Sequence, residues 1–117
     1  MSLVLDGTLG VQVPASSTGN SGAVAWANFV GSSGTKNASY NVGTITRTGT
    51  GQYTVNFANA LVDANYAVSF SSFLNGAAAG RAFIITAMSA SAFSFYNSAS
   101  TTASYVDDTA VMFTVIR

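Results

Sequence analysis

The chain has 117 residues, of which only 7% are charged, and its formal net charge is zero. Four lysines and arginines do not make the cationic cluster with which a nucleic-acid binder replaces counterions on phosphate, nor do they favour an anionic membrane surface. Cysteine, histidine and glutamate are absent, so the residues that usually build catalytic and metal sites are nearly all missing. We expect one domain that is not an enzyme, with no catalytic residues, cofactor or metal.

Residues 1–22 differ in composition from the rest of the chain. The segment LVLDGTLGVQVP contains two short extended stretches broken by glycine, and the linker-like ASSTGNSG follows it. The start lacks the basic and apolar regions of a signal peptide, and no stretch reaches the length of about 20 apolar residues needed to cross a membrane as a helix. We therefore expect synthesis in a cytoplasm. The segment could be a frayed tail or an arm that docks on a neighbouring protein. Its apolar side chains favour the docking arm, and they are Leu3, Val4, Leu5, Val11 and Val13.

The stretch AWANFVGSSGTKNASYNV, from Ala25 to Val42, contains the only tryptophan, Trp26. An isolated tryptophan can be a ligand platform, but here it lies in a strand-like segment close to Phe29. Large rings gain most by burial, so we expect Trp26 and Phe29 to anchor the core or a subunit interface. The small, polar residues of Gly31–Asn37 then predict an exposed loop whose base is held by Trp26.

The remaining chain alternates bulky and small side chains with a period of two, which is typical of strands packed on one face. The clearest strands are Gln52–Phe57, Asn65–Ser71, Arg81–Met88, Ser91–Tyr96 and Ala110–Ile116. Thr48-Gly49-Thr50-Gly51 predicts a hairpin turn, and the connection Asn59–Ala64 places Leu61 over the edge of the core. The spacing predicts an all-β fold: a single antiparallel β-sandwich, jelly-roll-like or a small barrel, over residues 23–117, preceded by the extended arm 1–22.

The second face of the predicted strands is less polar than a solvent-exposed face should be. It carries Ala82, Ile84, Met88, Met112 and Ile116. Two interpretations remain open: these strands are covered on both sides within the domain, or the face is a subunit interface. A closed homo-oligomer, with a trimer as the working hypothesis, fits the second interpretation.

One long loop and its flanks carry the residues that most resemble a shallow sugar-binding site. Exposed aromatic rings with amide and carboxylate groups are the chemistry of such sites, and the candidates here are Tyr96, Asn97, Tyr105, Asp107 and Asp108. The simpler interpretation is that the two tyrosines anchor the loop. Neighbours in an extended segment point to opposite sides, so the two aspartates do not form the acid/base pair of a glycosidase.

The segment from Ala25 to Val68 resembles a repeated pattern of bacteriophage virion proteins, especially tail-fibre proteins. In that pattern A-W-V-N-F precedes a Gly/Thr-rich loop, S-x-N-V-S-S-I-T-D-N-G-T-G-D-Y-T-V-N-F follows, and then P-D-A-N-Y. The chain departs from it at Ala27, Gly43, Arg47, Gln52 and Val62. It matches at Ala25, Trp26, Asn28, Phe29, Ser39, Asn41, Val42, Ile45, Thr46, Gly49, Thr50, Gly51, Tyr53, Thr54, Val55, Asn56, Phe57, Asp63, Ala64, Asn65 and Tyr66.

The resemblance implies a non-enzymatic structural protein of the virion, made in the host cytoplasm. One expectation is a trimeric tail-fibre module that contacts other virion proteins and a host surface glycan. A second is a decoration (cement) protein that stabilises the phage head through its N-terminal arm. A free carbohydrate-binding lectin is a third expectation, because the strand pattern also suits small lectin sandwiches.

Overall fold

The computed structural model describes residues 5–6, 10–11, 22–74 and 80–117. Two short strands, β1 (Leu5–Asp6) and β2 (Gly10–Val11), pair antiparallel with each other. Of the predicted docking arm, Leu3, Val4 and Val13 lie outside the described residues. Within the described ranges no helix is long and apolar enough to cross a membrane.

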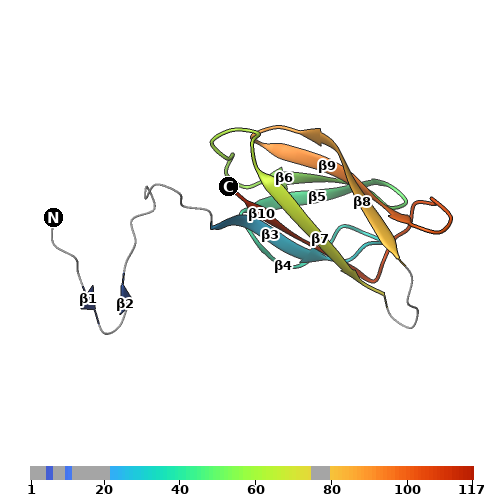
Figure 1. Ribbon diagram of the computed structural model, residues 1–117, viewed down its shortest axis with the longest axis horizontal. Helices are drawn as coiled ribbons and strands as arrows, with labels where there is room; N and C mark the ends of the chain where they lie inside the picture. Colours follow the sequence, from blue (N-terminus) through green and yellow to red (C-terminus); the bar gives the residue numbers. More distant parts are fainter. Residues whose placement is uncertain (1–4, 7–9, 12–21, 75–79) are drawn as a thin grey trace.

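Eight further strands form two four-stranded antiparallel sheets that pack face to face (Figure 1). Sheet I has the order β4-β3-β10-β7, and sheet II has the order β5-β6-β9-β8. The prediction of a single antiparallel β-sandwich is therefore confirmed. The strands of sheet I are β4 (Lys36–Tyr40), β3 (Ala23–Phe29), β10 (Ala110–Ile116) and β7 (Ala67–Phe73). Those of sheet II are β5 (Val42–Gly49), β6 (Gln52–Phe57), β9 (Ala92–Ala99) and β8 (Arg81–Met88).

The predicted strand positions agree closely with the structure because the alternation in the sequence is strong. β6, β8 and β10 have the predicted bounds, whereas β7 begins and ends two residues later than predicted. β9 begins one residue later than predicted and continues three residues beyond Tyr96. The later start of β7 has a local cause: the Asn65 amide donates to the Asp63 carboxylate, which closes a turn just before the strand. The predicted hairpin turn joins β5 to β6, and Gly51 adopts there the positive φ of 64° that favours glycine.

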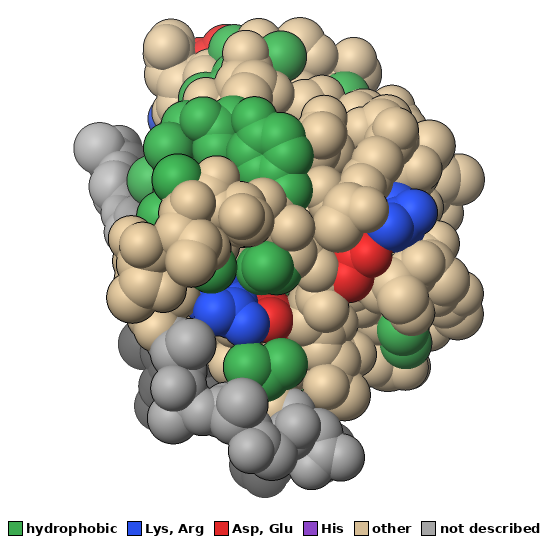
Figure 2. Space-filling view, turned by 90° about the vertical axis from the view of Figure 1, so that its right-hand side faces the viewer, with side chains coloured by type: hydrophobic (Ala, Val, Ile, Leu, Met, Phe, Trp, Pro, Cys, Tyr) green, Lys and Arg blue, Asp and Glu red, His purple; other side chains and the backbone are tan. Residues whose placement is uncertain are grey.

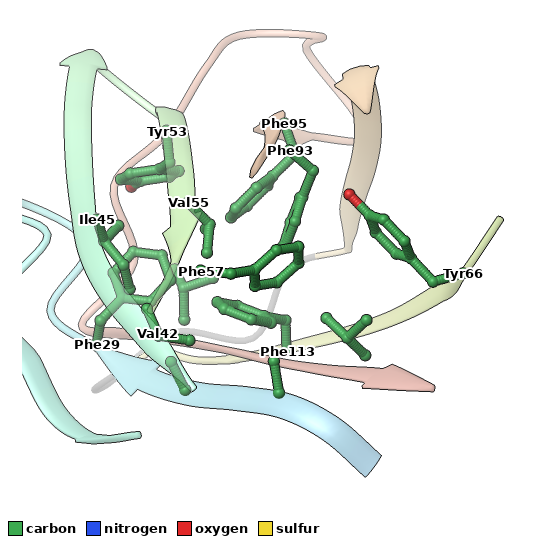
Figure 3. Close-up of a cluster of buried hydrophobic side chains, with 14 residues drawn as sticks. Phe29, Val42, Ile45, Tyr53, Val55, Phe57, Tyr66, Phe93, Phe95 and Phe113 are labelled. Carbon is green, nitrogen blue, oxygen red and sulfur yellow. The ribbon is translucent and has the colours of Figure 1, made fainter. Parts of the chain in front are cut away.

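Aromatic rings from both sheets fill the core (Figure 3). Phe29 of sheet I meets Tyr53 of sheet II with ring centroids 5.1 Å apart, and Phe113 meets Phe93 at 5.2 Å, both edge to face. Such pairs contribute beyond the area that they bury. Leu61 packs against this core from the connection after β6, as the sequence predicted. The alternating inward residues of the two sheets therefore hold the sandwich together.

Trp26 is not part of this core. It lies on the outer face of β3 and is 39% exposed, whereas Phe29 on the inner face is fully buried. The core alternative for Trp26 is wrong because β3 buries Ala25, Ala27 and Phe29, and a period of two sends Trp26 the other way. A role in a subunit interface remains a prediction. The predicted loop Gly31–Asn37 is shorter in the structure, because Lys36 and Asn37 belong to β4, and Gly31 and Gly34 within it are buried. Its base is held instead by backbone hydrogen bonds, among them the Gly34 amide to the Val30 carbonyl.

Truncation of these two side chains should have unequal effects. Phe29→Ala removes a fully buried ring, and we expect it to lower the free energy of unfolding by about 3–5 kcal/mol. Trp26→Ala should cost less than half as much, because the strands of the sandwich leave 39% of this residue uncovered. Denaturant unfolding followed by far-ultraviolet circular dichroism measures both. Equal losses would contradict the outward placement of Trp26.

Candidate functional site

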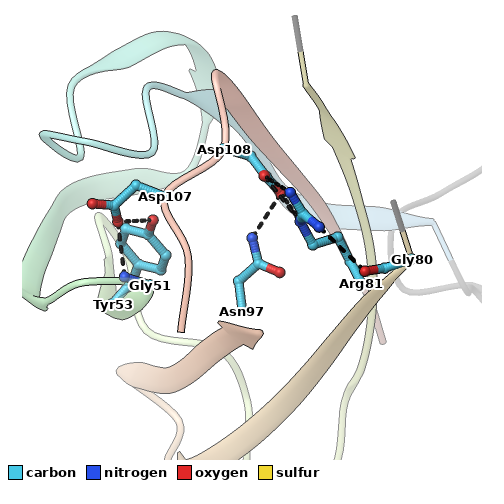
Figure 4. A network of polar contacts seen from close by, with 7 residues as sticks. All are labelled: Gly51, Tyr53, Gly80, Arg81, Asn97, Asp107 and Asp108. Carbon is cyan, nitrogen blue, oxygen red and sulfur yellow. Dashed lines mark hydrogen bonds and ion pairs between the residues drawn. The ribbon is translucent and has the colours of Figure 1, made fainter. Parts of the chain in front are cut away.

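Two of the three ion pairs among the described residues lie at one end of the sandwich, where the β5–β6 hairpin, the segment 100–109 and the loop after β3 meet (Figures 1 and 2). Asp107 and Asp108 lie in this region, just before β10 begins. Figure 4 shows their side chains reaching in different directions, Asp107 toward the hairpin and Asp108 toward β8. We call these two aspartates and their side-chain partners Arg47, Tyr53, Arg81 and Asn97 the Asp107–Asp108 network.

Asp107 ties β10 to the β5–β6 hairpin. Its Oδ2 accepts from Arg47 Nε at 3.0 Å and Nη2 at 2.6 Å, and its Oδ1 accepts from the Gly51 amide at 2.8 Å. The Tyr53 hydroxyl lies 2.8 Å from Asp107 Oδ1 and 2.8 Å from the Gly31 carbonyl oxygen. Both are acceptors, so the single hydroxyl proton serves one of them at a time. Both carboxylate oxygens thus have donors.

Asp108 ties the same segment to β8 and β9, and its side chain is fully buried. Arg81 Nε lies 2.9 Å from both carboxylate oxygens, and Arg81 Nη2 donates to Oδ1 at 2.6 Å. Asn97 Nδ2 adds a donor to Oδ2 at 2.8 Å. A buried carboxylate is tolerated only with such a complete set of partners. The cost is visible at Asn97: its buried Oδ1 has no hydrogen-bond partner among the described residues.

Glycine is required where the backbone approaches this network. A Cβ on Gly31 would lie 2.2 Å from the Asp108 carbonyl oxygen, and one on Gly51 would lie 2.6 Å from the Asn97 carbonyl oxygen. Real Cβ atoms do not come so close to backbone atoms. The loop after β3 and the β5–β6 hairpin can therefore close on the aspartates only with glycine at these positions.

The environment holds both carboxyl groups in their charged form. Burial raises the pKa of Asp107, but hydrogen bonds from Arg47, the Gly51 amide and Tyr53 lower it by more, so its pKa lies below the usual value. Burial again raises the pKa of Asp108, but hydrogen bonds with Arg81, Asn97 and Ser72 lower it by more. The pKa of Asp108 therefore also lies below the usual value. Burial, and then the neighbouring Asp107, raise the pKa of Tyr53. These shifts suit fixed structural charges and not proton transfer near neutral pH.

Of the five predicted surface-binding residues, the structure leaves two accessible. Asn97 and Asp108 are buried, and Asp107 is held by Arg47, so none of these three side chains is free to meet a surface ligand. Tyr96 and Tyr105 do come together, with ring centroids 4.8 Å apart, and Tyr105 is exposed. Their contact fits the simpler interpretation, in which the tyrosines anchor the loop. Figure 2 shows a patch of hydrophobic side chains on this end.

Sequence reasoning missed the partners Arg47, Arg81 and Tyr53, because they lie far from the aspartates in the chain. One signal pointed to Arg47: the resembling pattern has an acid at that position, and a change of charge there implies a changed partner. In the described residues, no three acidic side chains gather as a metal site would require.

Comparisons with protein-family models, with curated proteins and with solved structures find no match.

The buried ion pair should matter far more to stability than the exposed one. Asp108→Asn keeps the shape of the side chain but leaves the Arg81 charge unpaired, and we expect the free energy of unfolding to fall by about 3 kcal/mol. Asp63→Asn makes the same chemical change at the exposed Arg117–Asp63 pair and should leave the denaturant midpoint nearly unchanged. Similar losses in the two variants would show that Asp108 has no special role.

The lowered pKa values of Asp107 and Asp108 also predict how stability depends on pH. These carboxyl groups bind protons at a higher pH in the unfolded chain than in the folded chain. Their contribution to the free energy of unfolding is therefore complete above about pH 5 and is lost as the pH falls below about 4. Asp108→Asn removes one of these groups and should flatten the acid limb. Denaturant titrations at several pH values measure the slope. An unchanged slope in the variant would contradict the assigned shift.

Proposed function

We propose that the chain is a non-enzymatic structural protein of a bacteriophage virion: an oligomeric, trimeric module of tail-fibre type that contacts the host surface. The resemblance of Ala25–Val68 to phage virion proteins motivates the setting. Part of that match is explained by the core, since Phe29 and Val55 are buried. Matches at Trp26, Asn28 and Thr46 lie on outer faces, where a sandwich core does not dictate the residue.

The observation that carries the oligomeric part is the incompletely covered side of the sandwich between β7 and β8. These are edge strands of sheets I and II, so each has one side without a strand partner among the described residues. Their inward side chains pack on the core without being fully buried: Val68, Phe70, Phe83 and Ile85. On the same two strands Phe73, Ile84 and Met88 are exposed, Phe73 and Ile84 on the outer faces. Core rings thus continue to the surface along this side, which we call the β7–β8 flank.

No charge protects the flank from association. β7 has the sequence AVSFSSF, and β8 carries no charged residue after Arg81. Edge strands of monomers usually bear charges, prolines or bulges that prevent pairing with another chain. β8 has one such irregularity, opposite β9, but it leaves Ile84 exposed. Copies of the same chain, packed flank to flank around an axis, would cover these side chains and close the core.

The oligomer can be tested with the full chain in solution. We expect a sedimentation mass of three times the 11.9 kDa of one chain. Ile84→Asp places a charge on the flank and should dissociate the oligomer, while Thr46→Asp places the same charge on the outer face of β5 and should not. Circular dichroism confirms that both variants fold. A stable monomer of the unsubstituted chain at every concentration would refute intrinsic oligomerisation.

The position in the particle needs a separate experiment. Purified virus particles from the source of the sequence are analysed by mass spectrometry and then labelled with gold through antibodies to the protein. Peptides in the particles and gold on the tails support the proposal. Gold on heads alone would favour the decoration protein, and a protein found only outside particles would overturn the virion assignment.

A further inference from the structure

An apolar area on the outer face of sheet I lies apart from the β7–β8 flank. Trp26 and Tyr40 are directly opposite each other on β3 and β4, with exposures of 39% and 56%. On β10, Thr114 faces Trp26, and the next outward residues on either side are Met112 and Ile116. Cross-strand and diagonal neighbours on one face lie within reach of one another. We call Trp26, Tyr40, Met112 and Ile116 the Trp26 patch.

No outward side chain of the four strands is charged, and the nearest charges in the sequence are Arg117, directly after Ile116, and its partner Asp63. The outward residues are aromatic, aliphatic, hydroxyl or amide side chains, such as Asn28, Thr114 and Ser69. A hollow of about 310 Å³ adjoins the patch and is lined by Tyr40, Asn41, Ala58, Asn59 and Ala60. Tyr40 belongs to both the patch and the hollow, so the two form one continuous surface on which a segment of chain can pack.

The N-terminal part of the chain enters the sandwich beside this surface. β3 begins at Ala23, which pairs with Ile116 of the patch, and Figure 1 shows the start of β3 and the end of β10 at the same end of the sandwich. At the hollow, Asn41 Nδ2 donates to the Val24 carbonyl oxygen at 3.2 Å. Any segment immediately before Ala23 therefore starts within a few residues of both the patch and the hollow.

The upstream segment has the length and the chemistry to cover this surface. Residues 12–22 separate β2 from β3 and can span up to about 36 Å when extended. The distance from Ala23 to Trp26 along β3 is only about 10 Å, so the chain has room to turn back. The segment 3–13, LVLDGTLGVQV, contains one charge and several large apolar residues. The β1–β2 hairpin has two residues per strand, and a hairpin of this size needs a packing partner to be stable in water.

We propose that residues 3–13 dock on the Trp26 patch and the adjoining hollow of the same chain. The sequence predicted a neighbouring protein as the partner of this arm; the point at which the chain enters β3 favours its own sandwich instead. The contact is independent of the oligomer proposed above, because it uses the outer face of sheet I and not the flank. It shields the indole of Trp26 with the apolar side chains of the arm.

The sole tryptophan makes the contact measurable in the full chain. Leu5→Ser combined with Val11→Ser should weaken docking, shift Trp26 emission to the red and raise its acrylamide quenching constant by about two-fold, as expected when a covered ring becomes exposed. Ser16→Ala combined with Ser17→Ala alters the linker alone and should leave both values unchanged. Equal emission and quenching in all three proteins would overturn the proposal.

A second measurement detects the contact directly and identifies the chain that makes it. The protein has no cysteine, so Thr8→Cys can carry a single bimane label, whose fluorescence an indole quenches on contact. We expect quenching that Trp26→Phe abolishes and that persists over roughly hundred-fold dilution, since an attached segment keeps its effective concentration. The same label at Ser100→Cys, at the other end of the sandwich, should not be quenched. Absence of Trp26-dependent quenching, or its loss on dilution, would exclude docking within one chain.

Discussion

Each arginine of this chain is paired with an aspartate of the same chain, and the position of the loops depends on two of these pairs. Arg47 and Arg81 hold Asp107 and Asp108 from opposite sides of one short segment. Because that segment leads directly into β10, the central strand between β3 and β7, the pairs connect sheet I to β5 and β8 of sheet II. The aromatic core stabilises the packing of the two sheets. The Asp107–Asp108 network fixes the positions of the loops at one end of the sandwich.

This use of charge has a consequence for the surface. With Arg117 held by Asp63 and the Lys36 ammonium directed to the carbonyl oxygens of Val42 and Gly43, the lysine and arginine side chains all have partners within the chain. Little charge remains to keep copies apart in solution. In an isolated chain the exposed apolar side chains of the β7–β8 flank then face water with little charge around them. A protein that works inside an assembly can tolerate such a surface, which is the physical basis of the virion proposal.

The sequence predicted the sandwich well because the signals were local. QYTVNF and AVMFTVI alternate without interruption, and both strands formed with the predicted bounds. The site was predicted less well because it depends on distant pairs: nothing near Asp108 indicates that Arg81 lies within 3 Å of it. Trp26 shows the limit of residue type as a guide. A large ring is stabilised by burial, but the alternation of β3 points Trp26 to the outer face. The position of the residue in the strand therefore outweighed the general preference of tryptophan for the core.

We propose that apolar side chains of the β7–β8 flank hold the copies together, and the dependence of association on salt tests this claim because it separates apolar contacts from ionic ones. We predict that the full chain sediments as an oligomer whose stability is unchanged or increased by high concentrations of sodium chloride, since salt screens charges and strengthens apolar burial. Sedimentation equilibrium at low and high salt measures this. An oligomer that dissociates as salt is added would contradict the claim, because it would show that exposed charges hold the copies together.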